Sequence, residues 1–119
     1  MTTRTAPITP TRTATHALQA KLFRGFTDPA RLVILEALCS APRTVGELSA
    51  IAELSQPATS NHLACLLDCG LVQREQRGRY GVYSIADARV PLLLQLGGEM
   101  LRDHAAQVAA CTHMGTSGG

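Results

Sequence analysis

Apolar residues recur at the spacing of an α-helix over most of the first seventy positions. One set predicts a helix over residues 16–26, and a second set predicts a helix that begins at Asp28-Pro29 and ends at Pro42. The inward positions of this second helix are predicted to be Leu32, Leu35, Leu38 and Cys39. We therefore expect two consecutive amphipathic helices, with Cys39 in the core.

A third helix is predicted to begin at Thr44, because Thr44 and Glu47 have the spacing of a capping box. Its inward positions are predicted to be Val45, Leu48, Ile51 and Ala52. After a loop of two or three residues, Ser55 caps a fourth helix that has Pro57 in its first turn and Gly70 after its end. Two short helices joined by a tight turn are typical of a helix-turn-helix.

The fourth helix is predicted to carry two kinds of surface. Leu63, Leu66 and Leu67 have the i, i+3, i+4 spacing of an inward stripe. At about 100° per residue, Cys65 and Cys69 point roughly 130° away from the centre of that stripe. We therefore expect both cysteines to lie outside the core of their own domain.

The pattern changes after residue 70. Apolar and polar residues alternate through residues 71–86, which predicts a β-hairpin with Arg77-Gly78-Arg79 at its tip. A last helix is predicted from Asp87 to Cys111, with Gly97-Gly98 as its weak point. Because this helix has more apolar residues than one stripe needs, we expect it to form a dimer interface together with the first helix.

Length and composition indicate one domain. The chain has 119 residues and is 45% hydrophobic, which suits a single small core. Residues 1–15 are predicted to be a disordered tail, residues 16–112 the folded domain, and residues 113–119 a flexible end. No apolar run approaches the eighteen or so residues of a membrane span, and the N-terminal segment has no apolar signal-peptide centre. We expect a cytoplasmic protein with no membrane partner.

The net charge of +2 is unevenly distributed. Residues 1–26 contain basic residues and no acid, residues 71–89 are also net basic, and the remainder is net acidic. A positive tail and a positive hairpin predict a phosphate-binding surface. Short hydrogen-bonding side chains at the start of the fourth helix suit base edges and phosphates, and basic and aromatic side chains of the hairpin suit phosphates or a minor groove. The predicted DNA-binding residues are Gln56, Thr59, Ser60, Asn61, His62, Arg77, Arg79 and Tyr80.

Three segments together resemble a known family. They are DPARLVILEAL in the second helix, QPATSNHLACLLDCGLV in the fourth, and RGRYGVYSI in the hairpin. These residues resemble the ArsR/SmtB family of bacterial metal-responsive repressors over about residues 16–112. The resemblance implies a mainly α, homodimeric winged helix-turn-helix with a β-hairpin wing and an extra helix at each end. It also implies that the start of the fourth helix enters the major groove of double-stranded operator DNA.

Within that family, Cys65-x-x-x-Cys69 with a cysteine near the C-terminus resembles the cadmium/lead-sensing branch. Residues four apart on a helix have Cβ atoms about 5 to 6 Å apart, so two thiolates can chelate one ion, whereas a disulfide would strain the helix. Cys111 is the predicted third ligand, and the resemblance favours its donation by the partner subunit. Three thiolates favour Cd(II) or Pb(II) as the inducer.

A nitrogen ligand would move this preference toward Zn(II). The candidates are His62, His104 and His113, and for each of them a role other than ligand is favoured.

The function expected from these features is a metal-sensing transcriptional repressor. It would bind operator DNA as a metal-free dimer and be released by Cd(II) or Pb(II). Two alternatives keep the same fold, namely a thiol-redox-responsive and an arsenite-responsive repressor. A thiol enzyme or a metal carrier is an alternative of another class, but the sequence contains no nucleophile–base pair and no Gly-rich phosphate loop, so we do not expect an enzyme.

Overall fold

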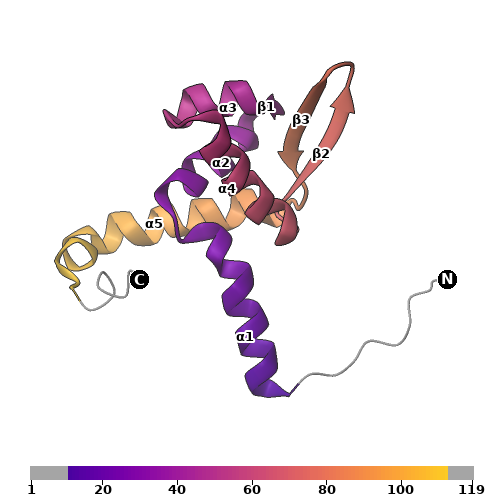
Figure 1. The fold of residues 1–119 in the computed structure, drawn as a ribbon. Helices are drawn as coiled ribbons and strands as arrows, with labels where there is room; N and C mark the ends of the chain where they lie inside the picture. The colour runs from indigo at the N-terminus through magenta and orange to yellow at the C-terminus, as the bar shows by residue number, and fades with distance from the viewer. Residues whose placement is uncertain (1–10, 113–119) are drawn as a thin grey trace. The chain divides into compact units, whose positions relative to one another are not determined.

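A computed structural model describes residues 11–112, which form two compact units that meet between Ala86 and Asp87. The first unit contains every element up to the hairpin, and the second contains one helix (Figure 1). The elements are α1 (Arg12–Phe23), the 3-10 helix η1 (Arg24–Phe26), α2 (Pro29–Ser40), β1 (Arg43–Thr44), α3 (Val45–Ala52), α4 (Gln56–Asp68), β2 (Val72–Arg77), β3 (Tyr80–Ile85) and α5 (Arg89–Ala110). This order confirms a winged helix-turn-helix with an added helix at each end.

Local capping sets the starts of the helices. The Asp28 carboxylate accepts from the amide of Ala30 at 2.8 Å, and the Ser55 hydroxyl accepts from that of Ala58 at 3.2 Å. Thr44 and Glu47 form the predicted capping box. The first helix begins at Arg12, earlier than predicted, because the Thr11 hydroxyl caps it. The remaining part of the predicted N-terminal tail and the predicted flexible end lie outside the described residues.

The buried core lies between α2, α3, α4 and the start of β2. Its aliphatic members are Ile34, Leu35, Leu38, Leu48, Leu63, Leu66, Leu71 and Val72. Four positions predicted to face inward are instead exposed, which corrects those predictions: Leu32, Cys39, Ile51 and Leu67. The buried face of α2 is centred on Ile34, Leu35 and Leu38, so Cys39 falls beyond its edge at about 100° per residue.

The turn between α3 and α4 is held from both sides by one serine. The Ser49 hydroxyl donates to the carbonyl of Leu54, and the amide of Leu54 donates back to the Ser49 carbonyl at 3.0 Å. Between them Glu53 has a left-handed backbone with φ of 57°. Since a side chain in this conformation costs about 1 to 2 kcal/mol, the turn keeps its shape against local strain.

The end of α4 is a Schellman motif. The amide of Gly70 donates to the carbonyl of Leu67, and that of Leu71 donates to Leu66, both at 3.0 Å. Gly70 has φ of 76°, which confirms it as the predicted helix stop. Leu71 also packs against Gly25, where an added Cβ would lie 2.4 Å from its Cδ1. The end of α4 therefore lies directly against η1, the 3-10 helix that follows α1.

The predicted hairpin is confirmed. β2 and β3 are antiparallel, with Arg77 opposite Tyr80 and a Gly78-Arg79 turn in which Gly78 has φ of 61°. The short strand β1 pairs with the other edge of β3, giving the order β1-β3-β2. This two-residue strand was not predicted, because it is too short to show alternation.

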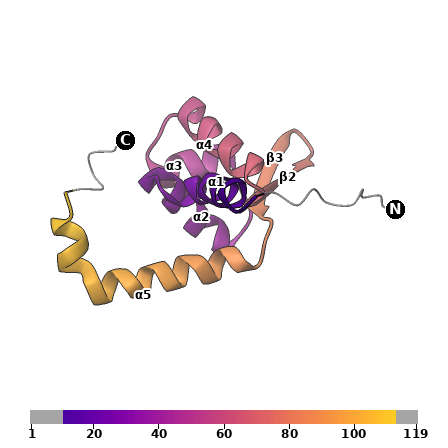
Figure 2. The ribbon, with the colours of Figure 1, turned by 90° about the horizontal axis from the view of Figure 1, so that it is seen from below.

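The second unit consists of α5 and its flanking residues. The Asp87 carboxylate accepts from both the amide and the guanidinium of Arg89, which lowers the pKa of Asp87 to about 2. The helix bends at His104, where φ is −127°, and the bend is visible in Figure 2. The predicted weak point at Gly97-Gly98 is therefore wrong, because helical backbone continues through both glycines. Among the described residues no helix is long and apolar enough to cross a membrane.

Candidate nucleic-acid interface and metal centre

The first two turns of α4 present three of the predicted DNA-binding side chains to solvent. Gln56, Ser60 and Asn61 are all exposed. Thr59 is fully buried, and its hydroxyl donates to the Ser55 carbonyl at 2.9 Å. Its assignment to the DNA-binding set is therefore wrong, because its side chain packs into the core with Leu63. A hydroxyl that bonds back to its own helix is compatible with a core position, which the sequence pattern did not reveal.

His62 is half-buried and is held by an arginine from α2. The guanidinium of Arg31 lies 3.2 Å from His62 Nδ1 and donates twice to the Arg24 carbonyl, at 2.9 and 3.1 Å. Since a guanidinium can only donate, Nδ1 is the acceptor and the proton of the ring is placed on Nε2. Arg31 thus fixes the ring that follows the exposed part of α4. Sequence reasoning missed this residue because its contact joins positions 31 apart.

The hairpin has two chemically different faces. On one face Arg77 and Glu75 form an exposed ion pair at 3.0 Å. On the other face Arg74 lies over the ring of Tyr83, 5.9 Å from its centroid. Tyr80 is 60% exposed and stands beside the turn that carries Arg79. Arg74 was not among the predicted DNA-binding residues. It lies opposite Tyr83 and two residues before Gln76, so these three side chains share one face of the hairpin.

The thiol pair lies at the other end of α4. Cys65 and Cys69 are half-buried, and the Cys69 thiol donates to the Lys21 carbonyl in the last turn of α1, with a sulfur–oxygen distance of 3.8 Å. Burial raises the pKa of Cys69, and the neighbouring Cys65 thiol and Asp68 carboxylate raise it further, against the opposing effect of Arg31. The two thiols therefore lie close enough to affect each other's ionisation, and Cys69 is a thiol at neutral pH.

The other predicted metal ligand lies on the second unit. Cys111 is the exposed C-cap residue of α5, after the bend at His104. His113 lies outside the described residues. Within residues 11–112 of one chain, no three Cys, His, Asp or Glu side chains gather closely enough to hold an ion. The donor chemistry of Cys65 and Cys69 fits a soft metal ion, and this pair alone supplies two ligands.

The sequence of the chain is similar to those of known proteins, and these similarities identify its family. Residues 28–74, from the cap of α2 into β2, match the model of the bacterial regulatory protein, arsR family. The chain is 39% identical over 95 residues to a probable mercury resistance operon repressor of Streptomyces lividans, which covers 80% of this chain and 76% of that protein. The chain belongs to the arsR family.

Two further similarities cover most of the chain. The regulator CmtR of Mycobacterium tuberculosis is 39% identical over 83 residues, covering 70% of this chain and 68% of that protein. The crystal structure of M. tuberculosis Rv0081 superposes with a TM-score of 0.73 at 31% identity, covering 81% of this chain and 97% of that one. This arsR-family member is therefore a DNA-binding transcriptional repressor rather than an enzyme.

Proposed function

We propose that this repressor binds an inverted-repeat operator as a metal-free homodimer and is released when Cd(II) or Pb(II) binds cysteine thiolates. The observation that carries the proposal is the layout of α4. Its first turns expose Gln56, Ser60 and Asn61, Cys65 lies in its last turn, and Cys69 is its C-cap residue. A ligand bound to the thiols therefore acts on the same thirteen-residue helix that reads the DNA.

The metal centre needs a further ligand beyond the α4 pair. Cys111 is the proposed third thiolate, donated by a second copy of the chain, because it is exposed at the end of α5 and carries the same soft donor. Three sulfurs suit large soft ions better than Zn(II), which usually takes four ligands. Binding at Cys69 also removes the proton that this thiol donates to Lys21, so the link between α4 and α1 changes with the ion.

Dimerisation is supported by two apolar surfaces. In α1 no residue is buried, and Leu18, Leu22 and Phe23 are exposed. In α5 an apolar stripe is also exposed, formed by Leu92, Leu93, Leu96, Met100 and Leu101. A second copy would cover such stripes and would place two recognition helices on two operator half-sites.

Operator binding measured with and without metal tests the proposal. Saturating Cd(II) or Pb(II) is expected to lower operator affinity by about 5- to 150-fold, the usual range of an allosteric coupling. Cys65→Ser, Cys69→Ser and Cys111→Ser should each weaken metal binding and abolish release. Cys39→Ser is the matched control, because Cys39 is exposed on α2 and belongs to no thiol pair. Unchanged operator affinity at saturating metal would exclude the proposal.

A second candidate inducer is Hg(II). The relative from Streptomyces lividans is described as a mercury resistance operon repressor, and Hg(II) is a soft ion that two thiolates can hold. Arsenite and thiol oxidation remain alternatives on the same cysteines. A panel of Cd(II), Pb(II), Hg(II), arsenite and peroxide, each titrated against the operator complex, ranks them by the concentration that releases half of the DNA.

A further inference from the structure

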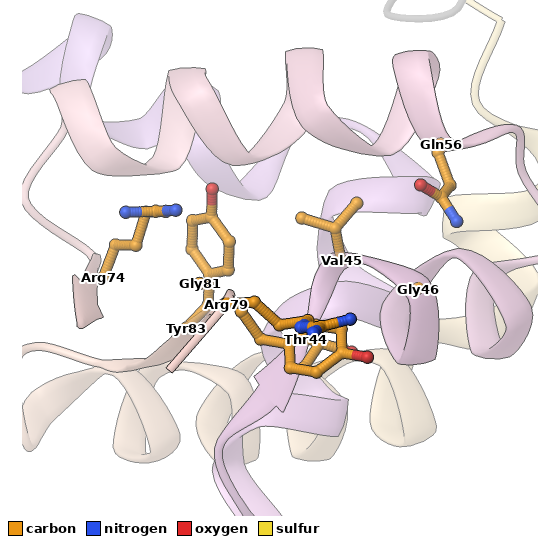
Figure 3. A pocket seen from close by; sticks show the side chains of 9 residues that line it. Thr44, Val45, Gly46, Gln56, Arg74, Arg79, Gly81 and Tyr83 are labelled. Carbon is orange, nitrogen blue, oxygen red and sulfur yellow. The ribbon is translucent and has the colours of Figure 1, made fainter. Parts of the chain in front are cut away.

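A cavity of about 260 Å³ lies between the hairpin and the starts of two helices. Thr44 and Gly46 contribute from the start of α3, Gln56 from the start of α4, and Arg74, Arg79 and Tyr80 from the hairpin. Figure 3 shows Arg74 and Gln56 reaching toward this space from opposite ends. The cavity therefore borders every element that the proposed function assigns to DNA.

Arg74 is held in this cavity by a small network. Its guanidinium donates to Gln76 Oε1 at 2.9 Å, while the Gln76 amide donates to the Gly78 carbonyl at 3.0 Å. These bonds fix which end of the Gln76 amide faces the arginine. The ring of Tyr83 supports the guanidinium from the neighbouring strand. Arg74 is thus oriented by side chains of its own hairpin and remains available to an anion.

A glycine on β3, Gly81 opposite Gln76, leaves room for the Arg74 side chain. A Cβ added at Gly81 would lie 2.3 to 2.5 Å from Nη2, Nε and Cζ of Arg74. The guanidinium consequently lies flat across β3 only because residue 81 has no side chain. The backbone of Gly81 is not left-handed, so any residue could adopt its φ. Glycine is needed there because a side chain would occupy the space of the Arg74 guanidinium.

The charge of the cavity suits an anion. Arg74 and Arg79 both line it, and none of the described residues that line it is a carboxylate. The capping box occupies the amides of Thr44 and Glu47, whereas those of Val45 and Gly46 belong to the first helical turn, where amides have no partner within the helix. Two guanidinium groups and a helix start facing one space are a recurrent arrangement for phosphate.

We propose that this cavity binds one backbone phosphate of the operator, held by Arg74 together with Arg79 and the first turn of α3. The inference rests on operator binding by the proposed repressor and adds a contact between the wing and the helix-turn-helix. Its ligand chemistry is a phosphate monoanion, and DNA is the source because the cavity is lined by Gln56 of α4 and by Arg79 and Tyr80 of the wing, which are predicted DNA-binding residues.

The salt dependence of operator binding tests this site. Each phosphate contact contributes about 0.9 to the slope of log affinity against log salt concentration. With an operator selected from random duplexes, Arg74→Gln should reduce this slope by about one per bound chain and weaken binding roughly tenfold. Gly81→Ala should act in the same direction with no change of charge, and its melting temperature shows whether it still folds. An unchanged slope in Arg74→Gln overturns the proposal.

Two controls distinguish a phosphate contact of Arg74 from an effect of net charge and from binding of a free anion. Arg102→Gln removes one positive charge from α5 without touching the cavity, so an equal loss of slope in this variant would assign the effect to net charge and overturn the site. Inorganic phosphate is titrated against the DNA-free protein at constant ionic strength. Binding of phosphate that Arg74→Gln abolishes, without a change in the operator salt slope, would assign the cavity to a free anion instead. Metal-dependent release of the wild-type protein is measured separately, so failure of the proposed inducer is distinguishable from failure of this site.

Discussion

Single side chains set what each end of α4 can do. Arg31 bonds to His62 on one side and to Arg24, the first residue of η1, on the other, while Cys69 bonds to the last turn of α1. Neither bond is between neighbours in sequence, and both connect α4 to the N-terminal part of the unit. A change in protonation or ligand binding at His62 or Cys69 therefore also changes a contact outside α4.

Arg31→Gln is expected to weaken operator binding about tenfold, because His62 loses the donor that fixes its ring. Nitrogen NMR of the histidine ring should show one tautomer, protonated on Nε2, in the wild type and a mixture in the variant. Arg43→Gln is the matched control, since Arg43 also donates to a main-chain carbonyl, that of Ala37, but contacts no histidine. A variant with one tautomer and full operator affinity would show that Arg31 does not position His62.

Metal affinity is expected to rise with pH, because Cys69 must lose its proton to bind an ion. Its pKa is raised, so below that pKa the thiol contributes about a tenfold gain in apparent Cd(II) affinity per pH unit, and the gain continues to higher pH than for an ordinary cysteine. Competition titrations between pH 6 and 9 measure this slope. Cys69→Ser should lower the slope by about one, whereas Cys39→Ser should leave it unchanged.

At the scale of helices and strands, local signals predicted the fold well. Asp28, Thr44, Ser55 and Gly70 all act where their residue types indicated, because capping involves only a few neighbouring positions. The alternation of residues 71–86 likewise predicted the hairpin. These features are readable because the interacting groups are close in sequence.

The buried side of each helix was less predictable. The second helix has apolar residues on several faces, and the partners in α3 and α4 decide that Ile34 and Leu35 are buried while Cys39 is exposed. Thr59 was misassigned for the same reason, since its burial beside Leu63 depends on tertiary packing. The space that Gly81 leaves for Arg74 depends on strand register, which the sequence pattern alone does not fix.

The turn between α3 and α4 is expected to become more stable when Glu53 is replaced by glycine. Glycine adopts the left-handed backbone without steric cost, so Glu53→Gly should raise the free energy of unfolding by up to ~1 kcal/mol, or about 4 °C in Tm. Gly70→Ala is the control with the opposite expected effect and should lower the free energy of unfolding. Its added Cβ meets no atom within 4 Å, so the loss comes from backbone strain alone. Calorimetry checks both signs, and a less stable Glu53→Gly variant would contradict the prediction.

At the scale of the whole molecule, Val90 is the only buried residue among residues 87–112 of the second unit, so these residues form no core among themselves. The unit is essentially one 22-residue helix with an apolar stripe on it, and such a helix depends on another surface for stability. The bend at His104 separates this stripe from the last turns, which lead to Cys111. The part of α5 that would pair two chains is therefore distinct from the part that carries a sulfur.

Leu96→Lys is expected to weaken dimerisation at least tenfold, because symmetry places the new charge twice in an apolar interface. Gln95→Lys is the matched control, since Gln95 lies beside the stripe and bonds to Glu99, which a lysine would also pair with. Sedimentation velocity measures the dissociation constants. A Leu96→Lys protein that stays dimeric at the concentrations at which the wild type does would place the interface elsewhere.

The helix α4 carries the exposed side chains that are proposed to bind DNA together with Cys65, and Cys69 is its C-cap residue. Under the proposed function, thermodynamic linkage makes the effect reciprocal, so the operator must oppose the metal by the same factor by which the metal opposes the operator. Protein bound to its operator would then need a higher free metal concentration to respond than protein free in solution. The number of operator sites in a cell would thus help to set the metal concentration at which repression ends.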